Sequence, residues 1–409
     1  SEMCIRDRLN VDLLYSHNCV THFLMVEKAL IDCIGMSPED VAGAQDYDLT
    51  LRCLAAGARF EHIAHMLYHW RVHPGSTADG SADSKPYAIE AGRLALQRHF
   101  NELGICGTVE DTETPFVYRM RYELPESAPL VSIVIPTKDH VETLDACVMS
   151  IAQKATYANY EIVLVENNSE APDTFAYYET LPERVASASE GKGIARVAYW
   201  PGEFNYSQII NFGAEHAKGD YLLLLNNDTE VISSDFIEEM MGYLQRPDAG
   251  VVGAKLYFAD HLVQHAGILV GVRGALAHAN QDFSAKREGY LARAVRPGNF
   301  SAVTGACQMV RRDVFERVGG YNEEFAVGFN DADFCLRVWE AGYRTIFTPY
   351  AELYHYEFTS RGREEANEEK MCRRKREQVL FMQRWPEFFL DGDPWLGPNL
   401  SFDSECFSL

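Results

Sequence analysis

The sequence predicts an α/β fold with a parallel sheet at its centre, on the basis of three observations. Short apolar runs at 131–136, 160–165 and 221–225 have the length and aliphatic content of buried strands. Between the first two runs, Leu144 and Val148 recur at helical spacing. Each run is followed by polar residues, and strand ends of this kind bind ligands in α/β proteins. We therefore expect a ligand site at the carboxyl edge of the sheet.

Composition limits the class of protein. The chain has 409 residues, 47% of them hydrophobic, which is enough for two or three globular domains. Lys+Arg number 37 against 60 Asp+Glu, and the net charge of −23 argues against nucleic acid as a partner. The 10 cysteines contain no CxxC pair and favour a reducing cytoplasm over a disulfide scaffold. No apolar stretch approaches the roughly 18 residues of a membrane-spanning helix.

The predicted elements follow one another as strand, helix, strand, helix. The strand at 131–136 runs into Pro-Thr-Lys-Asp, and the strand at 160–165 ends on Glu166. A third strand at 196–200 precedes a helix around 209–217. No GxGxxG or P-loop follows the first strand, which disfavours a dinucleotide-dependent dehydrogenase and a P-loop NTPase.

The fourth strand is an apolar run that ends on Asn226-Asn227-Asp228. A carboxylate at the carboxyl edge of a sheet can hold a hard divalent cation against a diphosphate. The alternative is an Asx turn that closes the strand. Asp228 is therefore a candidate metal ligand, with a turn residue as the competing interpretation.

The chain contains an internal repeat. The segment GAQDYDLTLRCLAAG matches the later segment GFNDADFCLRVWEAG, and both copies continue to Leu-Tyr-His. In this register Asp46 and His69 correspond to Asp331 and His355. The first copy lacks the opening strands of the second, so it has no counterpart of the nucleotide-side residues. We expect this half copy to be inactive and the native reading frame to extend upstream by about 150 residues.

These patterns predict five segments. Residues 1–8 resemble translated sequencing adapter and carry no fold prediction; 9–75 form the C-terminal half of a first domain, 76–129 a linker with a helix, 130–390 a complete domain and 391–409 an extended tail.

Seven motifs of the complete domain, in order, resemble those of family 2 glycosyltransferases with the GT-A fold. They are VSIVIPTKDH, EIVLVENNS, FNYSQIINFG, LLLLNNDTEV, GACQMVRRDVFERVGGYNEEF, FNDADFCLR and LYHYEFTSRG. The resemblance implies a Rossmann-like mixed sheet flanked by helices, preceded here by a partial second copy. The tandem arrangement is similar to bacterial enzymes that build cell-surface polysaccharide.

The resemblance also implies roles for single residues. Asp331 would be the general base that takes the proton of the acceptor hydroxyl, and a single base without an enzyme nucleophile implies inversion. Asp228 and His355 would hold Mn²⁺ or Mg²⁺ against the departing nucleoside diphosphate. The donor-binding residues that it implies are Thr137, Asp139, Glu166, Asn205, Asn211 and Asn227.

Several of these residues have a structural alternative. Helix capping, backbone contacts or simple burial are the alternatives for Asp139, Asp331, Asn205, Asn211 and His355. In addition, Asn226 stands where the family's DxD motif has its first acid, which puts coordination by that side chain in doubt.

The sequence thus predicts a metal-dependent, inverting glycosyltransferase that moves a sugar from a nucleotide donor to a saccharide or lipid-linked acceptor in the bacterial cytoplasm. The alternative is a non-catalytic carbohydrate-binding or scaffold module on a decayed transferase fold, motivated by Asn226. The basic run at 373–376 leaves contact with the inner membrane face open, although glutamates at helical spacing before it favour a solvated helix.

Overall fold

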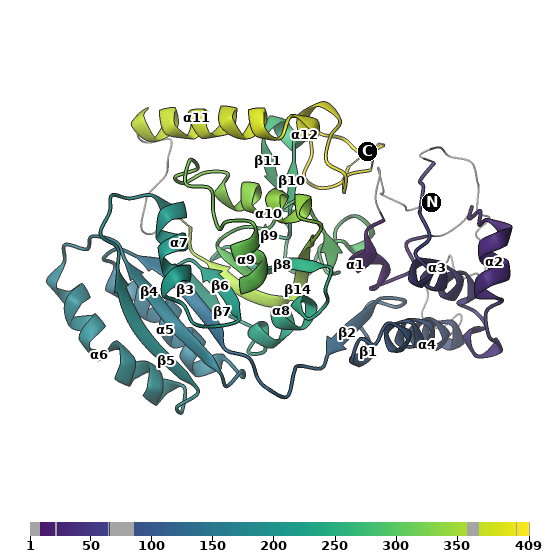
Figure 1. Cartoon of the computed structure of the whole chain (residues 1–409), viewed down its shortest axis with the longest axis horizontal. Coiled ribbons are helices and arrows are strands. Elements are labelled where there is room, and N and C mark those ends of the chain that lie inside the picture. The colour runs from purple at the N-terminus through teal and green to yellow at the C-terminus, as the bar shows by residue number, and fades with distance from the viewer. Residues whose placement is uncertain are drawn as a thin grey trace.

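The computed structural model describes residues 9–20, 23–63, 65, 86–357, 368–397 and 399–408. These residues form a large α/β unit and a smaller N-terminal unit that lies against one end of it (Figure 1).

The large unit is built on one mixed sheet. Its spatial order is β12 (Gly298–Asn299), β14 (Arg344–His355), β8 (Ala249–Tyr257), β13 (Cys307–Arg311), β6 (Tyr221–Leu225), β3 (Val131–Thr137), β4 (Tyr160–Glu166) and β5 (Gly193–Tyr199). The last four strands are parallel, while β13 runs antiparallel to both β6 and β8. The mixed, Rossmann-like sheet is confirmed, and β13 is where the all-parallel pattern of the first strands breaks.

Helices cover both faces of this sheet because its central strands are apolar on both sides. Along β3, Ile133 and Ile135 pack on one face and Val134 packs on the other. The first face carries α5 (Val141–Lys154), α6 (Pro172–Ala188) and α8 (Phe236–Leu244). The second carries α7 (Tyr206–His216), α9 (Arg312–Arg317) and α10 (Asn330–Glu340).

Short elements complete the large unit. They are β7 (Thr229–Val231) beside β14, β9 (Val263–His265) beside β8, the antiparallel hairpin of β10 (Ile268–Val270) and β11 (Leu276–His278), and the helices α11 (Glu368–Arg384) and α12 (Pro386–Leu390). The chain after α12 packs on the hairpin region, where buried Asp393 accepts the N–H of Val270 at 2.7 Å. Among the described residues, no helix combines the length and the apolar content needed to cross a membrane.

The N-terminal unit has its own hydrophobic core. It comprises α1 (Val11–Leu14), α2 (Lys28–Ile34), α3 (Gln45–Ala55), α4 (Pro86–Glu102) and the hairpin of β1 (Gly107–Asp111) and β2 (Tyr118–Tyr122). Leu14, Leu51, Leu96 and Val109 belong to one buried cluster. The helix and strand of the predicted linker therefore pack with α1 and α3 instead of merely connecting two domains.

Buried polar contacts join the two units. Asp12 and Arg246, which are 1% and 3% exposed at their side chains, form an ion pair at 2.6 Å. Asn10 and Asn299 exchange two hydrogen bonds of 3.0 and 2.9 Å, and the Asn299 amide donates to Asp12 at 2.6 Å. Because none of these groups reaches solvent, each depends on its partner across the interface.

The segments predicted as a repeat share an arrangement of side chains. Helices α3 and α10 have 11 residues each and begin 285 positions apart, at 45 and 330. In α3, Asp48 pairs with Arg52 at 2.9 Å, and in α10, Asp333 pairs with Arg337 at 2.8 Å. The two helices therefore agree in length and in their internal ion pair as well as in sequence.

Among the described residues, the correspondence extends to the next helix but not to strand β13. Arg98 of α4 binds Asp48 at 3.3 Å, and Arg384 of α11 binds Asp333 at 3.0 Å. By contrast, the counterpart of β13 is irregular, and its side chains Phe23 and Met25 are 67% and 78% exposed, whereas Met309 in β13 is buried. The counterpart of His355, His69, lies outside the described residues.

Candidate active site

The ends of β3, β4 and β6 bring three of the predicted donor-binding residues together. Thr137 is the register partner of Glu166 in the parallel pair β3–β4. The amide of Asn227, two residues after β6, donates to the hydroxyl of Thr137 at 3.3 Å. This cluster lies at the carboxyl edge of the sheet, where the sequence places a ligand site.

Glu166 is held by contacts that sequence reasoning missed. Its Oε2 accepts the hydroxyls of Ser169 at 2.7 Å and Tyr178 at 2.6 Å, and its Oε1 accepts the N–H of Ser169. The residue is buried. Its carboxylate is thus fixed in orientation, with some acceptor capacity left for a ligand.

Asp139 is used at the start of a helix. Its Oδ1 accepts the N–H groups of Glu170 and Ala171, both at 2.9 Å, beside the first turn of α6. Such a capping contact is the alternative to donor binding that the sequence predicts for Asp139. The helix whose N-terminus it binds is α6, not α5, which follows Asp139 in the chain. Only its second carboxylate oxygen remains for the predicted contact with a donor.

The contacts of Asn205 and Asn211 do not support their predicted role in donor binding. Asn205 caps α7 by accepting the N–H of Gln208 at 3.1 Å and donates to the carbonyl of Glu323 at 2.9 Å. Asn211 accepts from and donates to the backbone of Tyr321, at 2.8 and 2.9 Å. Both amides tie α7 to the segment before α10, because each offers the donor and the acceptor that a peptide group needs.

Asp228 and His355 meet at the ends of β6 and β14. His355 Nε2 lies 3.2 Å from Asp228 Oδ1, and both side chains are about nine-tenths buried, with 9% and 8% exposure. On the other side of the ring, Nδ1 lies 2.7 Å from Oε1 of Gln264. The Gln264 amide is oriented because its Nε2 donates to the carbonyl of His355. Nδ1 therefore carries the proton, and in neutral His355 the lone pair of Nε2 faces Asp228.

Asn226 completes this group of side chains. Its amide nitrogen lies 3.2 Å from His355 Nε2, and its oxygen accepts the hydroxyl of Tyr206 at 3.0 Å. The Asp228 carboxylate and the lone pair of His355 Nε2 thus lie together, a pair that suits a divalent cation whose other ligands are phosphate oxygens or water, whereas Asn226 presents its donating NH₂ group there and supplies no ligand atom. Within the described part of the chain, no cluster of three His, Cys, Asp or Glu residues forms a closed metal site.

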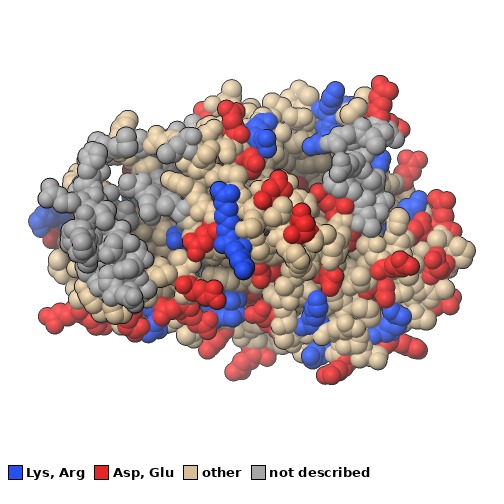
Figure 2. Space-filling model, turned by 180° about the vertical axis from the view of Figure 1, so that it is seen from behind, with Lys and Arg blue, Asp and Glu red and all other residues tan. Residues whose placement is uncertain are grey.

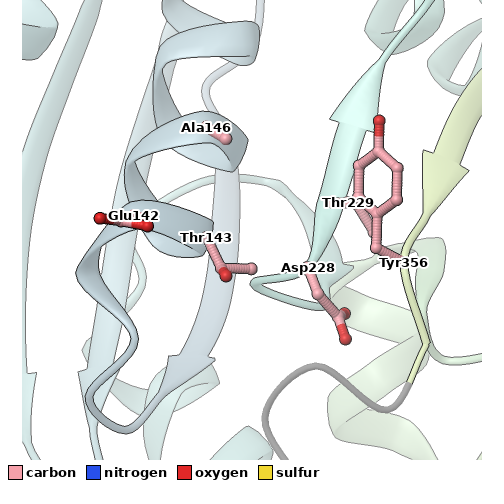
Figure 3. Close-up of a pocket in the computed structure, with 6 residues that line it drawn as sticks. All are labelled: Glu142, Thr143, Ala146, Asp228, Thr229 and Tyr356. Carbon is pink, nitrogen blue, oxygen red and sulfur yellow. The ribbon is translucent and has the colours of Figure 1, made fainter. Parts of the chain in front are cut away.

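A cavity of about 270 Å³ opens beside Asp228. It is lined by Glu142, Thr143, Ala146, Asp228, Thr229 and Tyr356. Figure 3 shows Asp228 between Thr143 of α5 on one side and Tyr356 on the other. The candidate cation ligand therefore has space next to it for a bound group.

Asp331 is the second residue of α10, and the residue before the helix turns the chain. Phe329 adopts a left-handed conformation with φ of 65°, and Asp331 Oδ1 accepts the N–H of Ala332 at 2.8 Å. Its Oδ2 accepts the N–H of Gly305 at 2.9 Å. The next carbonyl, that of Ala306, accepts the N–H of Asn226 at 3.0 Å. Adjacent residues of one loop thus connect the predicted base to the predicted cation site.

Asp333, which shares the first turn of α10 with Asp331, has a structural role. It is fully buried and binds Arg337 at 2.8 Å, Arg384 at 3.0 Å and the indole N–H of Trp385 at 3.1 Å. It faces the interior and joins α10 to α11. The pairing of Asp333 with an arginine four residues later was the signal in the sequence for this role.

The family assignment follows from the sequence of the sheet region. Residues 132–319 match the family model described as glycosyl transferase family 2. This stretch is a family 2 glycosyltransferase domain. The whole chain is 40% identical to an uncharacterized protein, y4gI, of Sinorhizobium fredii, over 98% of this chain and 43% of the relative. It is 34% identical to the O-antigen biosynthesis protein RfbC of Myxococcus xanthus, over 95% of this chain and 29% of that protein.

The chain spans less than half the length of these curated relatives. Among solved structures, it resembles GalNAc-T7 with UDP, GalNAc and Mn²⁺, with a TM-score of 0.50 at 16% identity, over 69% of this chain and 53% of that one. This similarity agrees with the GT-A fold that the motifs predict.

Proposed function

We propose that the chain is a metal-dependent, inverting glycosyltransferase that uses a nucleotide diphosphate sugar as donor. The observation that carries the proposal is the pair of Asp228 and His355, in which Gln264 turns the lone pair of His355 Nε2 toward Asp228. A cation at this group, Mn²⁺ or Mg²⁺, would neutralise charge on the departing diphosphate. GalNAc-T7, whose fold is similar, was solved with UDP and Mn²⁺.

The residues of the chain divide the reaction between them. Thr137, Glu166 and Asn227 at the strand ends would bind the nucleotide, because their hydroxyl, carboxylate and amide groups match ribose and base edges. Asp331 would accept the proton of the acceptor hydroxyl as its oxygen attacks the anomeric carbon. With one base and no nucleophile from the protein, the configuration at that carbon inverts.

The acceptor would be a saccharide or a lipid-linked saccharide of a cell-surface polysaccharide. The relative from Myxococcus xanthus is an O-antigen biosynthesis protein, which supports this class of product. We place the reaction in the cytoplasm, as the scattered cysteines without a CxxC pair predict, with contact to the inner membrane face as an added proposal.

The experiment that tests the proposal measures sugar transfer and donor hydrolysis by the full chain against a panel of nucleotide sugars, with Mn²⁺, Mg²⁺ or chelator. The variants are Asp228→Ala and Asp331→Asn. The matched control is Asp46→Asn, because Asp46 is the second residue of α3 as Asp331 is the second residue of α10, and its Oδ1 accepts the next N–H at 2.9 Å as that of Asp331 does at 2.8 Å.

Metal-dependent turnover of one donor, lost in Asp228→Ala and Asp331→Asn but kept in Asp46→Asn, is the expected outcome. A folded protein that leaves every donor intact but binds saccharide would instead favour the non-catalytic carbohydrate-binding alternative, in which Asn226 marks a lost metal ligand.

A further inference from the structure

Three histidines, His265, His278 and His355, lie close to one another, and His278 also lies near Asp331. Nδ1 of His265 lies 3.1 Å from Nδ1 of His278, the last residue of β11. Asp331 and His355 both lie close enough to His278 to influence its pKa, although burial, which lowers that pKa, is the larger effect. The β10–β11 hairpin thus carries a histidine toward the space between the predicted base and the predicted cation ligands.

The backbone fixes which nitrogen of His265 is protonated. Its Nε2 lies 3.3 Å from the nitrogen of Gly267 and 3.4 Å from that of Thr304. Since a peptide N–H can only donate, Nε2 accepts in both contacts. His265 is fully buried, and this burial lowers its pKa well below its ordinary value, so the ring is neutral. Its single proton is therefore on Nδ1.

The proton on Nδ1 of His265 in turn determines which nitrogen of His278 is protonated. His265 Nδ1–H donates across 3.1 Å, so Nδ1 of His278 must accept. A neutral imidazole with an accepting Nδ1 carries its proton on Nε2. His278 is partly exposed, whereas His265 is not. The pair therefore presents a neutral N–H donor of fixed orientation at the edge of the site.

We propose that Nε2–H of His278 donates a hydrogen bond to a hydroxyl oxygen of the sugar that is transferred, and so takes part in donor selection. This inference rests on the proposed function. In an inverting displacement, the anomeric carbon lies between the oxygen deprotonated by Asp331 and the diphosphate beside Asp228. The sugar ring must then occupy the space that His278 borders. A site that donates to one hydroxyl discriminates against sugars that lack it or carry it in the other configuration.

The test compares the affinity of the full chain for sugar nucleotides and for the corresponding diphosphates in Mn²⁺. Titration calorimetry would use UDP with UDP-glucose, UDP-galactose and UDP-N-acetylglucosamine, and dTDP with dTDP-rhamnose. The variants are His278→Ala, which removes the donor, and His278→Gln, which retains an N–H. The control is His216→Ala, because His216 is exposed at the far end of α7. Nitrogen-15 NMR of labelled histidine reads the tautomer of His278 directly.

We expect His278→Ala to weaken binding of the preferred sugar nucleotide about tenfold, the effect of one hydrogen bond, while diphosphate affinity stays within about twofold. His278→Gln should retain part of the preference, and NMR should find the proton on Nε2. The inference would be overturned if His278→Ala weakened binding of the sugar nucleotide and the diphosphate equally, or left the affinity for the sugar nucleotide unchanged. It would also be overturned if NMR found the proton of His278 on Nδ1, or if the wild-type protein bound no sugar nucleotide more tightly than the corresponding diphosphate. A wild-type protein that binds neither diphosphate with Mn²⁺ would overturn the proposed function itself.

Discussion

At the scale of single residues, Gln264 decides which nitrogen of His355 faces Asp228. The amide makes two contacts with the same residue, one to the ring and one to the carbonyl, at 2.7 and 3.2 Å. Partners of this kind set the tautomer of a metal-binding histidine and hold its ring in place. The sequence offered no sign of it, since Gln264 lies 91 positions from His355.

Replacing Gln264 by leucine should weaken Mn²⁺ binding in the presence of UDP by about 10- to 100-fold, because Nε2 of His355 is then free to carry the proton. Manganese titration followed by electron paramagnetic resonance measures this affinity. Gln264→Glu keeps an acceptor for Nδ1–H but loses the donor to the carbonyl, and should bind Mn²⁺ more tightly than the leucine variant. Unchanged affinity in Gln264→Leu would contradict this assignment.

Residue types at strand ends were predictable, but the partners of each side chain were not. Thr137, Glu166 and Asp228 follow apolar runs, and that pattern alone places them at the carboxyl edge. Asn205 and Asn211 sit in an equally suggestive motif, yet their amides serve the backbone at 321–323. Only the tertiary fold brings that segment beside α7, so sequence reasoning had no means to separate the two cases.

At the scale of elements, α11 braces the helix that carries Asp331. Asp333 of α10 binds Arg384, and Glu377 accepts the N–H groups of Val327 and Gly328 at 3.1 and 3.0 Å. Glu377 thereby holds the turn that leads into α10. In the N-terminal unit Ala91 stands 286 positions before Glu377, so the segment predicted to be a repeat of this one has the corresponding ion pair but no glutamate at this position.

Asp333→Asn should destabilise the protein by about 2 kcal/mol, less than for a fully buried pair because Arg384 is 40% exposed. It should also lower kcat, since α10 carries Asp331, the proposed base. The matched variant Asp48→Asn removes the corresponding ion pair in α3 and should reduce stability while leaving kcat unchanged. Urea denaturation and steady-state kinetics on both variants measure these effects; equal losses of kcat would refute the distinction.

The carboxyl group of Asp393 anchors the chain after α12, and its protonation affects the stability of the protein. Burial raises the pKa of Asp393 to about 6, above its ordinary value of 3.8. The folded protein therefore binds this proton more tightly than the unfolded chain does. The contribution of Asp393 to stability is accordingly most favourable below pH 4 and falls by about 3 kcal/mol as pH rises through 6.

The difference in unfolding free energy between the wild type and Asp393→Asn should therefore change between pH 4.5 and 7. The variant lacks the titrating group, so wild type should lose stability relative to it as the pH rises. Asn also loses one of the two backbone contacts, at 2.7 and 2.8 Å, and should be less stable at the acidic end. Parallel pH profiles of the two proteins would disprove the assignment.

At the scale of the whole molecule, the N-terminal unit is bound to the glycosyltransferase domain by buried charge. Figure 2 shows acidic side chains spread over one face with basic ones between them, in keeping with the net charge of −23. Asp12 and Arg246 differ from these surface charges because both are withdrawn from water. We propose that the unit is the half copy that the repeat predicts and that it folds as a fixed part of this chain.

Asp12→Ala should destabilise the full chain by about 3–5 kcal/mol, because it leaves Arg246 buried without its main partner. The double variant Asp12→Leu with Arg246→Met should recover most of this loss, since apolar groups of similar size need no partner. Chemical denaturation followed by tyrosine and tryptophan fluorescence gives both values. A single variant as stable as wild type would show that the interface is not needed.

Sequence periodicity predicted the parallel half of the sheet and missed how the other half joins it. Buried parallel strands are continuous apolar runs, and β3, β4 and β6 were predicted on that ground. The strand β13, Cys-Gln-Met-Val-Arg, is short and contains Gln308, which pairs with Tyr321 in the interior. No local pattern tells such a strand to run antiparallel between β6 and β8; that follows from long-range packing.

The loop that enters β13 has a consequence for how such enzymes diversify. Gly305 holds Asp331, and the neighbouring Ala306 holds the strand end that bears Asn226. The spacing between Asp331, the proposed base, and the proposed cation site is therefore set by two consecutive residues and not by the mutual orientation of domains. Insertions elsewhere can change the recognition of either substrate without changing the distance between Asp331 and the proposed cation site. A single residue added between Gly305 and Ala306 would increase that distance.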